Sequence, residues 1–121
     1  MPKYLAVLAA APGGDIVFRL LTSQPHGRPQ NPRCHHGDPY PSFYLGVLGG
    51  PLGKDSWLDL RGSEDYDGRQ FGDDKSAGKL TRVAEIPESL LRASLECAAA
   101  APDTTVAQEK AIRDQLALAN R

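Results

Sequence analysis

Apolar residues come in short runs along the first two thirds of the chain and at helical spacing in the last third. Two runs, 3–11 and 15–23, flank a Pro-Gly-Gly-Asp turn, whose glycines supply the positive φ that tight hairpin turns require, so they predict a β-hairpin. Three later runs, at 43–48, 56–60 and 79–86, predict further strands. The acidic stretch between the last two is expected to be a solvated loop.

The last third of the chain predicts two helices. Pro87 fits the first position of one helix, in which Leu91 and Leu95 share a face. Thr105 and Gln108 have the spacing of a capping box at the start of the other. We therefore expect a mainly β fold followed by a helical C-terminal part.

Length and composition fit one soluble domain, 1–121, with its β part at 3–86 and its helical part at 87–121. No run approaches the roughly 20 apolar residues of a membrane span, and the apolar run near the start is too short for a signal peptide. A cytoplasmic location is therefore expected. Two cysteines, Cys34 and Cys97, form no disulfide framework, and we expect free thiols in a reducing compartment, although sequence alone cannot judge their pairing.

A long segment, 24–53, is interrupted by six prolines, which largely exclude regular structure before Ser42. Such a segment is either a functional loop or a flexible excursion. It contains all three histidines and two arginines: His26, Arg28, Arg33, His35 and His36. The net charge of the chain is -1, so only this local cluster offers an anion site, unless it is simply a polar, solvated loop.

The same segment raises the question of a metal, because Cys34, His35 and His36 are consecutive. Adjacent residues rarely point at one ion, and structural zinc sites draw pairs of ligands from two segments. The only further cysteine or histidine is Cys97, far away in sequence. We therefore expect no metal and no cofactor.

The order of these parts resembles the PemK/MazF-type toxins of bacterial toxin–antitoxin systems. The resemblance lies in the runs 3–8, 21–24 (Leu-Thr-Ser-Gln), 54–60 (Lys-Asp-Ser-Trp-Leu-Asp-Leu) and 79–91, and it covers most of the chain loosely. It implies a small antiparallel β-barrel, a homodimer, an antitoxin partner, and cleavage of single-stranded RNA without a metal.

The resemblance also implies site residues. The hydroxyl of Thr22, with Ser23 beside it, matches the strand end that contacts the RNA phosphate in that family. The family usually carries a phosphate-binding Arg in a segment ahead of the strand matched by 3–8, so Arg28 or Arg33 is expected to replace it here. His26 or His35 is expected to transfer protons, because the pKa of histidine lies near neutrality.

A second hypothesis belongs to another functional class. The same barrel would be a catalytically idle binding or regulatory module that acts through protein partners, with the apolar stripe of the last helix as its contact. Two interpretations of Trp57 are also open: a core or interface residue, or a platform for stacking bases.

Overall fold

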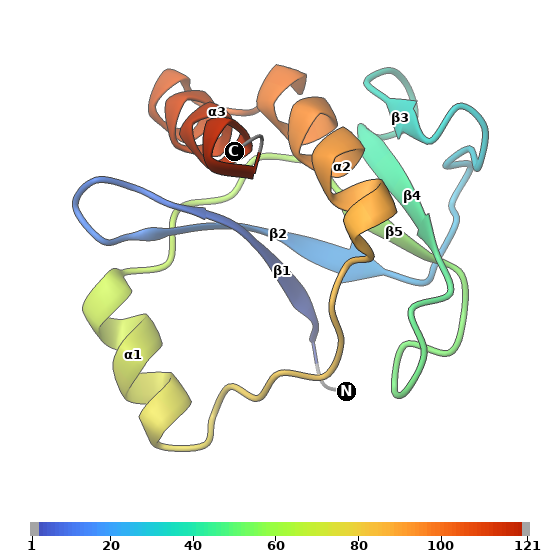
Figure 1. The fold of residues 1–121 in the computed structure, drawn as a ribbon. Coiled ribbons are helices and arrows are strands. Elements are labelled where there is room, and N and C mark those ends of the chain that lie inside the picture. The colour runs from blue at the N-terminus through green and yellow to red at the C-terminus, as the bar shows by residue number, and fades with distance from the viewer. Residues whose placement is uncertain (1–2, 120–121) are drawn as a thin grey trace.

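Five antiparallel strands form one open sheet in the order β1-β2-β5-β4-β3 (Figure 1). The computed structural model describes residues 3–119, and its strands are β1 (Leu5–Ala10), β2 (Ile16–Thr22), β3 (Cys34–His35), β4 (Ser42–Gly46) and β5 (Ser56–Asp59). The edges of the sheet, β1 and β3, do not pair with each other. The expected closed barrel is therefore wrong for the described residues, whereas the antiparallel sheet followed by C-terminal helices is confirmed.

The N-terminal hairpin is confirmed in detail. Val7 pairs with Phe18, and the turn is closed by a hydrogen bond of 2.8 Å from the Ala11 amide to the Asp15 carbonyl. The predicted strand at 79–86 is wrong, because that segment forms no strand pairing. Its alternation fails at Val83, which is exposed, and only Ile86 packs against the core.

The acidic stretch expected to be a loop contains a helix, α1 (Gly68–Ser76). Asp67 caps it, accepting a hydrogen bond from the Gln70 amide at 2.9 Å. Gly68 lies so close to the hairpin turn that a Cβ atom there would sit 2.2 Å from the Gly14 carbonyl oxygen. The helix was missed because none of its residues is buried, so it lacks an apolar stripe.

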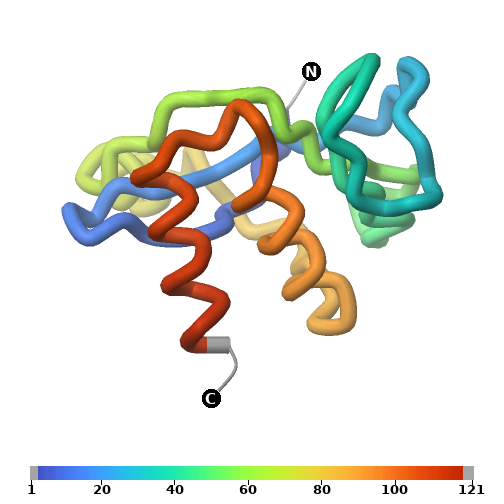
Figure 2. Tube along the Cα trace, turned by 90° about the horizontal axis from the view of Figure 1, so that it is seen from above, coloured from blue at the N-terminus to red at the C-terminus, as the bar shows by residue number. Residues whose placement is uncertain are grey.

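Two further helices, α2 (Glu88–Ala100) and α3 (Val106–Ala119), lie side by side on one face of the sheet (Figures 1 and 2). Pro87 is the N-cap of α2, one position earlier than expected. The predicted capping box is confirmed, since Thr105 and Gln108 exchange two hydrogen bonds of 3.1 Å. Within residues 3–119, none of the three helices has the length and apolar character needed to cross a membrane.

The core lies between the sheet and these two helices. The strands contribute Val17, Phe43 and Leu58, and the helices contribute Leu95 and Ile112, all of them almost fully buried. The three strand side chains project from the face of the sheet that the helices cover, because alternate residues of a strand project from opposite faces. The opposite face of β4 and β5 is therefore available to other side chains.

One charged residue is enclosed on the core side. Arg19 of β2 is 1% exposed and donates hydrogen bonds to the Phe18 carbonyl (2.7 Å) and to Gln108 Oε1 (2.9 Å). Burial lowers the pKa of Arg19, and the charges of nearby carboxylates, Asp65 above all, act in the opposite direction. Its Nε–H has no hydrogen-bond partner in the described chain, so burying this guanidinium carries a cost.

Candidate functional site

A cross-strand row occupies the sheet face that points away from α2 and α3. Thr22 pairs with Trp57, and Trp57 pairs with Tyr44. The Tyr44 amide donates a hydrogen bond of 2.9 Å to the Arg33 carbonyl, which places Arg33 next in the same row. Directly opposed residues project from the same face of an antiparallel sheet. We call Thr22, Trp57, Tyr44 and Arg33 the Thr22 row.

Contacts within the Thr22 row fix the exposed Arg33. Its guanidinium carbon lies 5.1 Å from the centroid of the Tyr44 ring, and its Nη1 donates to the Tyr44 carbonyl at 2.9 Å. The Tyr44 hydroxyl donates to Asp55 at 2.7 Å. This hydrogen bond raises the pKa of Tyr44, so the phenol is protonated at neutral pH and serves as a donor rather than a base.

The other end of the row is where β2 leaves the sheet. Thr22 Oγ1 accepts a hydrogen bond from the Gln24 amide at 3.1 Å, which turns the chain outward. Because a hydroxyl also carries one hydrogen of its own, Thr22 can still donate to an anion. Ser23 and His26 are both exposed just beyond it, and His26 has a positive φ of 42°.

Arg28, expected as a phosphate ligand, has a structural role instead. It is only 6% exposed, its Nη1 donates to the Gln24 carbonyl at 2.9 Å, and its guanidinium lies 4.6 Å from the Tyr40 ring centroid. Its Nη2 is 3.6 Å from Asp59 Oδ2. A phosphate would have to displace these partners, so the assignment of Arg28 to RNA binding is withdrawn.

Asp59 anchors two arginines. Arg61 Nη2 lies 2.7 Å from its carboxylate, and Arg28 approaches from the buried side. Burial by itself raises the pKa of Asp59, but the hydrogen bonds and charge of Arg61 and the charge of Arg28 outweigh it, and the net pKa is lowered. The carboxylate is thus charged at neutral pH and holds the proline-rich segment to the sheet.

Trp57 makes the second anchor of that segment. Its indole Nε1 donates to the Pro29 carbonyl at 2.9 Å, and the side chain is 3% exposed. A ring so enclosed cannot stack on a base, so the interpretation of Trp57 as a core residue is confirmed. The segment between β2 and β3 is therefore packed on the sheet rather than projecting from it.

The three histidines have separate surroundings. His35 pairs with Ser42 in the sheet, and its Nε2 lies 2.6 Å from the Asp38 carbonyl oxygen. His36 turns toward α2, with its Nε2 2.9 Å from the Cys97 carbonyl oxygen. Within residues 3–119, no hydrogen bond joins His26 to either of them. The proposed proton-transfer groups, His26 and His35, are therefore not hydrogen-bonded to each other.

The cysteines form a disulfide between Cys34 and Cys97, whose Cα atoms are 5.7 Å apart. The expected free thiols are wrong for this structure. Cys34 pairs with Phe43, so it projects from the face covered by α2, where Cys97 is buried. A separation of 63 residues hides this proximity in the sequence.

His36 completes what we call the cysteine cluster: Cys34, His36 and Cys97. Its Nε2 lies 3.5 Å from Cys34 Sγ and 3.4 Å from Cys97 Sγ. The cluster borders a surface hollow of about 390 Å³, to which Arg33 and Glu96 also contribute. Cys97, far away in sequence, is therefore close in space to the other two residues.

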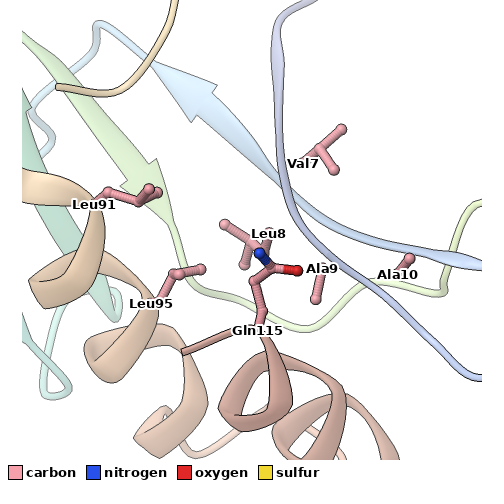
Figure 3. A pocket seen from close by; sticks show the side chains of 7 residues that line it. All are labelled: Val7, Leu8, Ala9, Ala10, Leu91, Leu95 and Gln115. Carbon is pink, nitrogen blue, oxygen red and sulfur yellow. The ribbon is translucent and has the colours of Figure 1, made fainter. Parts of the chain in front are cut away.

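A second hollow, of about 340 Å³, lies between β1 and the two C-terminal helices (Figure 3). Gln115 extends from α3 toward β1 there (Figure 3). The other residues that line this hollow are aliphatic: Val7, Leu8, Ala9, Ala10, Leu91 and Leu95. With no titratable or nucleophilic side chain, this hollow has no means of catalysis.

Sequence reasoning overlooked Tyr44, Asp55 and Asp59 as neighbours of the predicted site residues. Tyr44 and Asp59 lie in predicted strands and Asp55 directly precedes one, but the partners of all three depend on the strand order, which the pattern does not contain. Comparison of the chain with models of protein families, with curated proteins and with solved structures found no match, so its function is inferred from the resemblance and from geometry.

Proposed function

We propose that this chain acts on single-stranded RNA as a PemK/MazF-type endoribonuclease that needs no metal for cleavage, and that the Thr22 row is its phosphate-binding face. The observation that supports this most is the exposed Arg33 guanidinium held over Tyr44, in the same row as the strand-end hydroxyl of Thr22. A fixed guanidinium loses less conformational entropy on binding a phosphate than a mobile one.

The two groups fit two phosphates of one strand that are not nearest neighbours. Thr22 and Tyr44 are separated by one intervening strand, a distance of about 10 Å at the usual spacing of sheet strands. Arg33 uses one Nη1 hydrogen on the Tyr44 carbonyl, which leaves its Nε and Nη2 hydrogens for an anion. The RNA backbone would therefore pass from Thr22 to Arg33 over the proline-rich segment that covers Trp57.

Cleavage without a metal requires two proton transfers. A base removes the proton of the 2′-hydroxyl, the 2′-oxygen attacks phosphorus, the bond to the 5′-oxygen breaks, and an acid protonates that oxygen. We assign these steps to His26 and His35. His26 is exposed four residues after Thr22, and His35 belongs to β3, the edge strand that follows Arg33 and pairs with β4.

A homodimer, an antitoxin partner and a cytoplasmic location belong to the same proposal, since they follow from the same resemblance. In a reducing cytosol, Cys34 and Cys97 would be thiols for much of the time. The Thr22 row contains neither cysteine, although its member Arg33 directly precedes Cys34 and lines the hollow beside it.

The test is binding and cleavage of a mixed-sequence single-stranded RNA in the presence of a chelator. Arg33→Gln is expected to weaken binding about 10- to 100-fold, the usual effect of losing a charge-assisted hydrogen bond, and to reduce the slope of log K against log salt by about 0.7. Thr22→Val removes the hydroxyl while keeping the side-chain shape, and should reduce cleavage. Arg113→Gln, on the exposed surface of α3, is the matched control and should change nothing.

Each outcome has a distinct meaning. Chelator-resistant cleavage that is lost in Thr22→Val supports the nuclease. Binding without cleavage leaves an RNA-binding protein without nuclease activity. Equal binding by the native chain and Arg33→Gln contradicts the proposal and favours the module that acts through protein partners.

A further inference from the structure

We propose that the reduced form of this chain binds Zn²⁺ through the cysteine cluster, with Cys34 Sγ, Cys97 Sγ and His36 Nε2 as ligands. Cys34 belongs to β3, Cys97 belongs to α2, and His36 directly follows β3. The three ligand atoms all lie within 4.8 Å of one another. None of the three ligands is a member of the Thr22 row, so this inference does not rest on the proposed RNA function, although Arg33 lines the same hollow.

The distances to His36 already match a zinc site. With Zn–S bonds of about 2.3 Å and Zn–N bonds of about 2.0 Å, tetrahedral geometry places S and N ligand atoms about 3.5 Å apart. His36 Nε2 lies 3.5 Å from Cys34 Sγ and 3.4 Å from Cys97 Sγ. Once the disulfide is reduced, only the two sulfur atoms need to separate, to about 3.8 Å in the same geometry.

The charge of this ligand set suits the ion. Two thiolates and one neutral imidazole cancel the charge of Zn²⁺, so the site adds no net charge beside the buried Cys97. Sulfur and imidazole ligands select borderline and soft metals over Mg²⁺ or Ca²⁺. The fourth position faces the hollow of about 390 Å³, where a water molecule can occupy it and keep the site neutral.

The disulfide and the metal exclude each other. A dithiol reductant transfers two electrons and two protons to the Cys34–Cys97 bond, giving two thiols while it becomes a disulfide itself. Zn²⁺ then displaces both thiol protons. A peroxide reverses the process: it takes two electrons from the thiolates, the sulfur–sulfur bond forms again, Zn²⁺ leaves, and the peroxide becomes two hydroxide ions. In either state, β3 is fastened to α2.

His36 has a competing structural role that the test must separate. Its Nε2 lies 2.9 Å from the Cys97 carbonyl, one of the last four carbonyls of α2, and a donor there stabilises the end of a helix. Binding Zn²⁺ through Nε2 requires that atom to give up its hydrogen and this hydrogen bond. Glutamine at position 36 keeps a donor for the carbonyl but is a poor zinc ligand.

The experiment titrates Co²⁺, a spectroscopic substitute for Zn²⁺, into protein that has been reduced and freed of reductant without air. The reduced native chain is expected to show thiolate-to-cobalt charge-transfer bands and the visible bands of tetrahedral cobalt, and Zn²⁺ should abolish both. The oxidised chain should show neither, because disulfide sulfurs are not thiolates. His36→Gln should weaken binding by about 100-fold or more, given that even losing a ligand's supporting hydrogen bond costs 10- to 100-fold.

His35→Gln is the matched control. His35 neighbours His36, but its Nε2 lies against the Asp38 carbonyl and not against sulfur, so this variant should bind cobalt as the native chain does. Far-ultraviolet circular dichroism checks that the reduced proteins are folded. The proposal is overturned if the folded, reduced native chain binds no cobalt. It is equally overturned if His36→Gln binds cobalt as tightly as the native chain. The same result is expected if reduction unfolds the protein and the two thiols bind cobalt without His36.

Discussion

Reduction of the Cys34–Cys97 bond is expected to lower the free energy of unfolding by about 4 kcal/mol. The bond closes a loop of 63 residues in the unfolded chain. The loop-closure relation gives an entropy loss of about 14 cal/mol/K for a loop of that length, which corresponds to about 4.3 kcal/mol at 25 °C. The effect acts on the unfolded state, which becomes less disordered when it is cross-linked, and it therefore requires no strain in the fold.

The assay is urea unfolding of the same chain in its oxidised and reduced states, with a chelator present so that no metal replaces the disulfide. Trp57 is the only tryptophan, and it is 3% exposed, so its fluorescence reports the loss of the sheet. With a slope of about 1–3 kcal/mol/M, the midpoint should fall by roughly 1.5–4 M on reduction. The slope itself should rise on reduction, because the unfolded chain without a cross-link exposes more surface.

Two results would refute this reasoning. Coincident unfolding curves would show that the two sulfurs are not bonded in the folded protein. A fall in midpoint in Cys34→Ser alone that far exceeds the fall on reduction would show that the side chain at position 34 stabilises the fold by packing, and that loop closure is the smaller effect.

Three further changes test the electrostatics and the caps. Because the pKa of Asp59 is lowered on folding, its contribution to the free energy of unfolding is present above about pH 4 and is lost as the pH falls through the lowered pKa. Asp59→Asn should therefore be less stable than the native chain at pH 7 and should lose less stability on acidification. Parallel profiles of stability against pH for the two proteins would contradict this. Thr105→Ala should cost about 1 kcal/mol in urea unfolding, whereas the exposed Thr81→Ala should cost almost nothing. Arg19→Met should be clearly more stable than Arg19→Ala, because methionine fills the space without an unpaired donor, and equal stabilities would show that volume does not matter there.

The local pattern of the sequence predicted most strands and helix ends, because these depend on neighbouring residues. The hairpin turn and the capping box of Thr105 with Gln108 were both predicted and are both present. Two elements were predicted wrongly: a strand that is absent and a helix that was expected to be a loop. The segment 79–86 alternates imperfectly at Val83, and α1 has no buried face to reveal it.

The site was harder to predict, because it depends on strand order and register. Arg28 looked like a free cation in the sequence, and only the fold shows that Asp59 and Tyr40 enclose it. Likewise, Cys97 meets Cys34 only because β3 pairs with β4 in a register that turns Cys34 toward α2. Contacts over such separations have no local signal in a single sequence.

The two ends of the sheet differ in their capacity to accept another strand. β3, at one end, is two residues long and is bonded to α2 through Cys34. β1, at the other, is six residues long, and within residues 3–119 its outer edge pairs with no strand. Antiparallel addition of a second β1 would use up the open edge of both chains, so growth would stop at two copies. A sheet open at both ends could instead extend into a fibre, and the fastening of β3 thus limits the size of any assembly formed at β1.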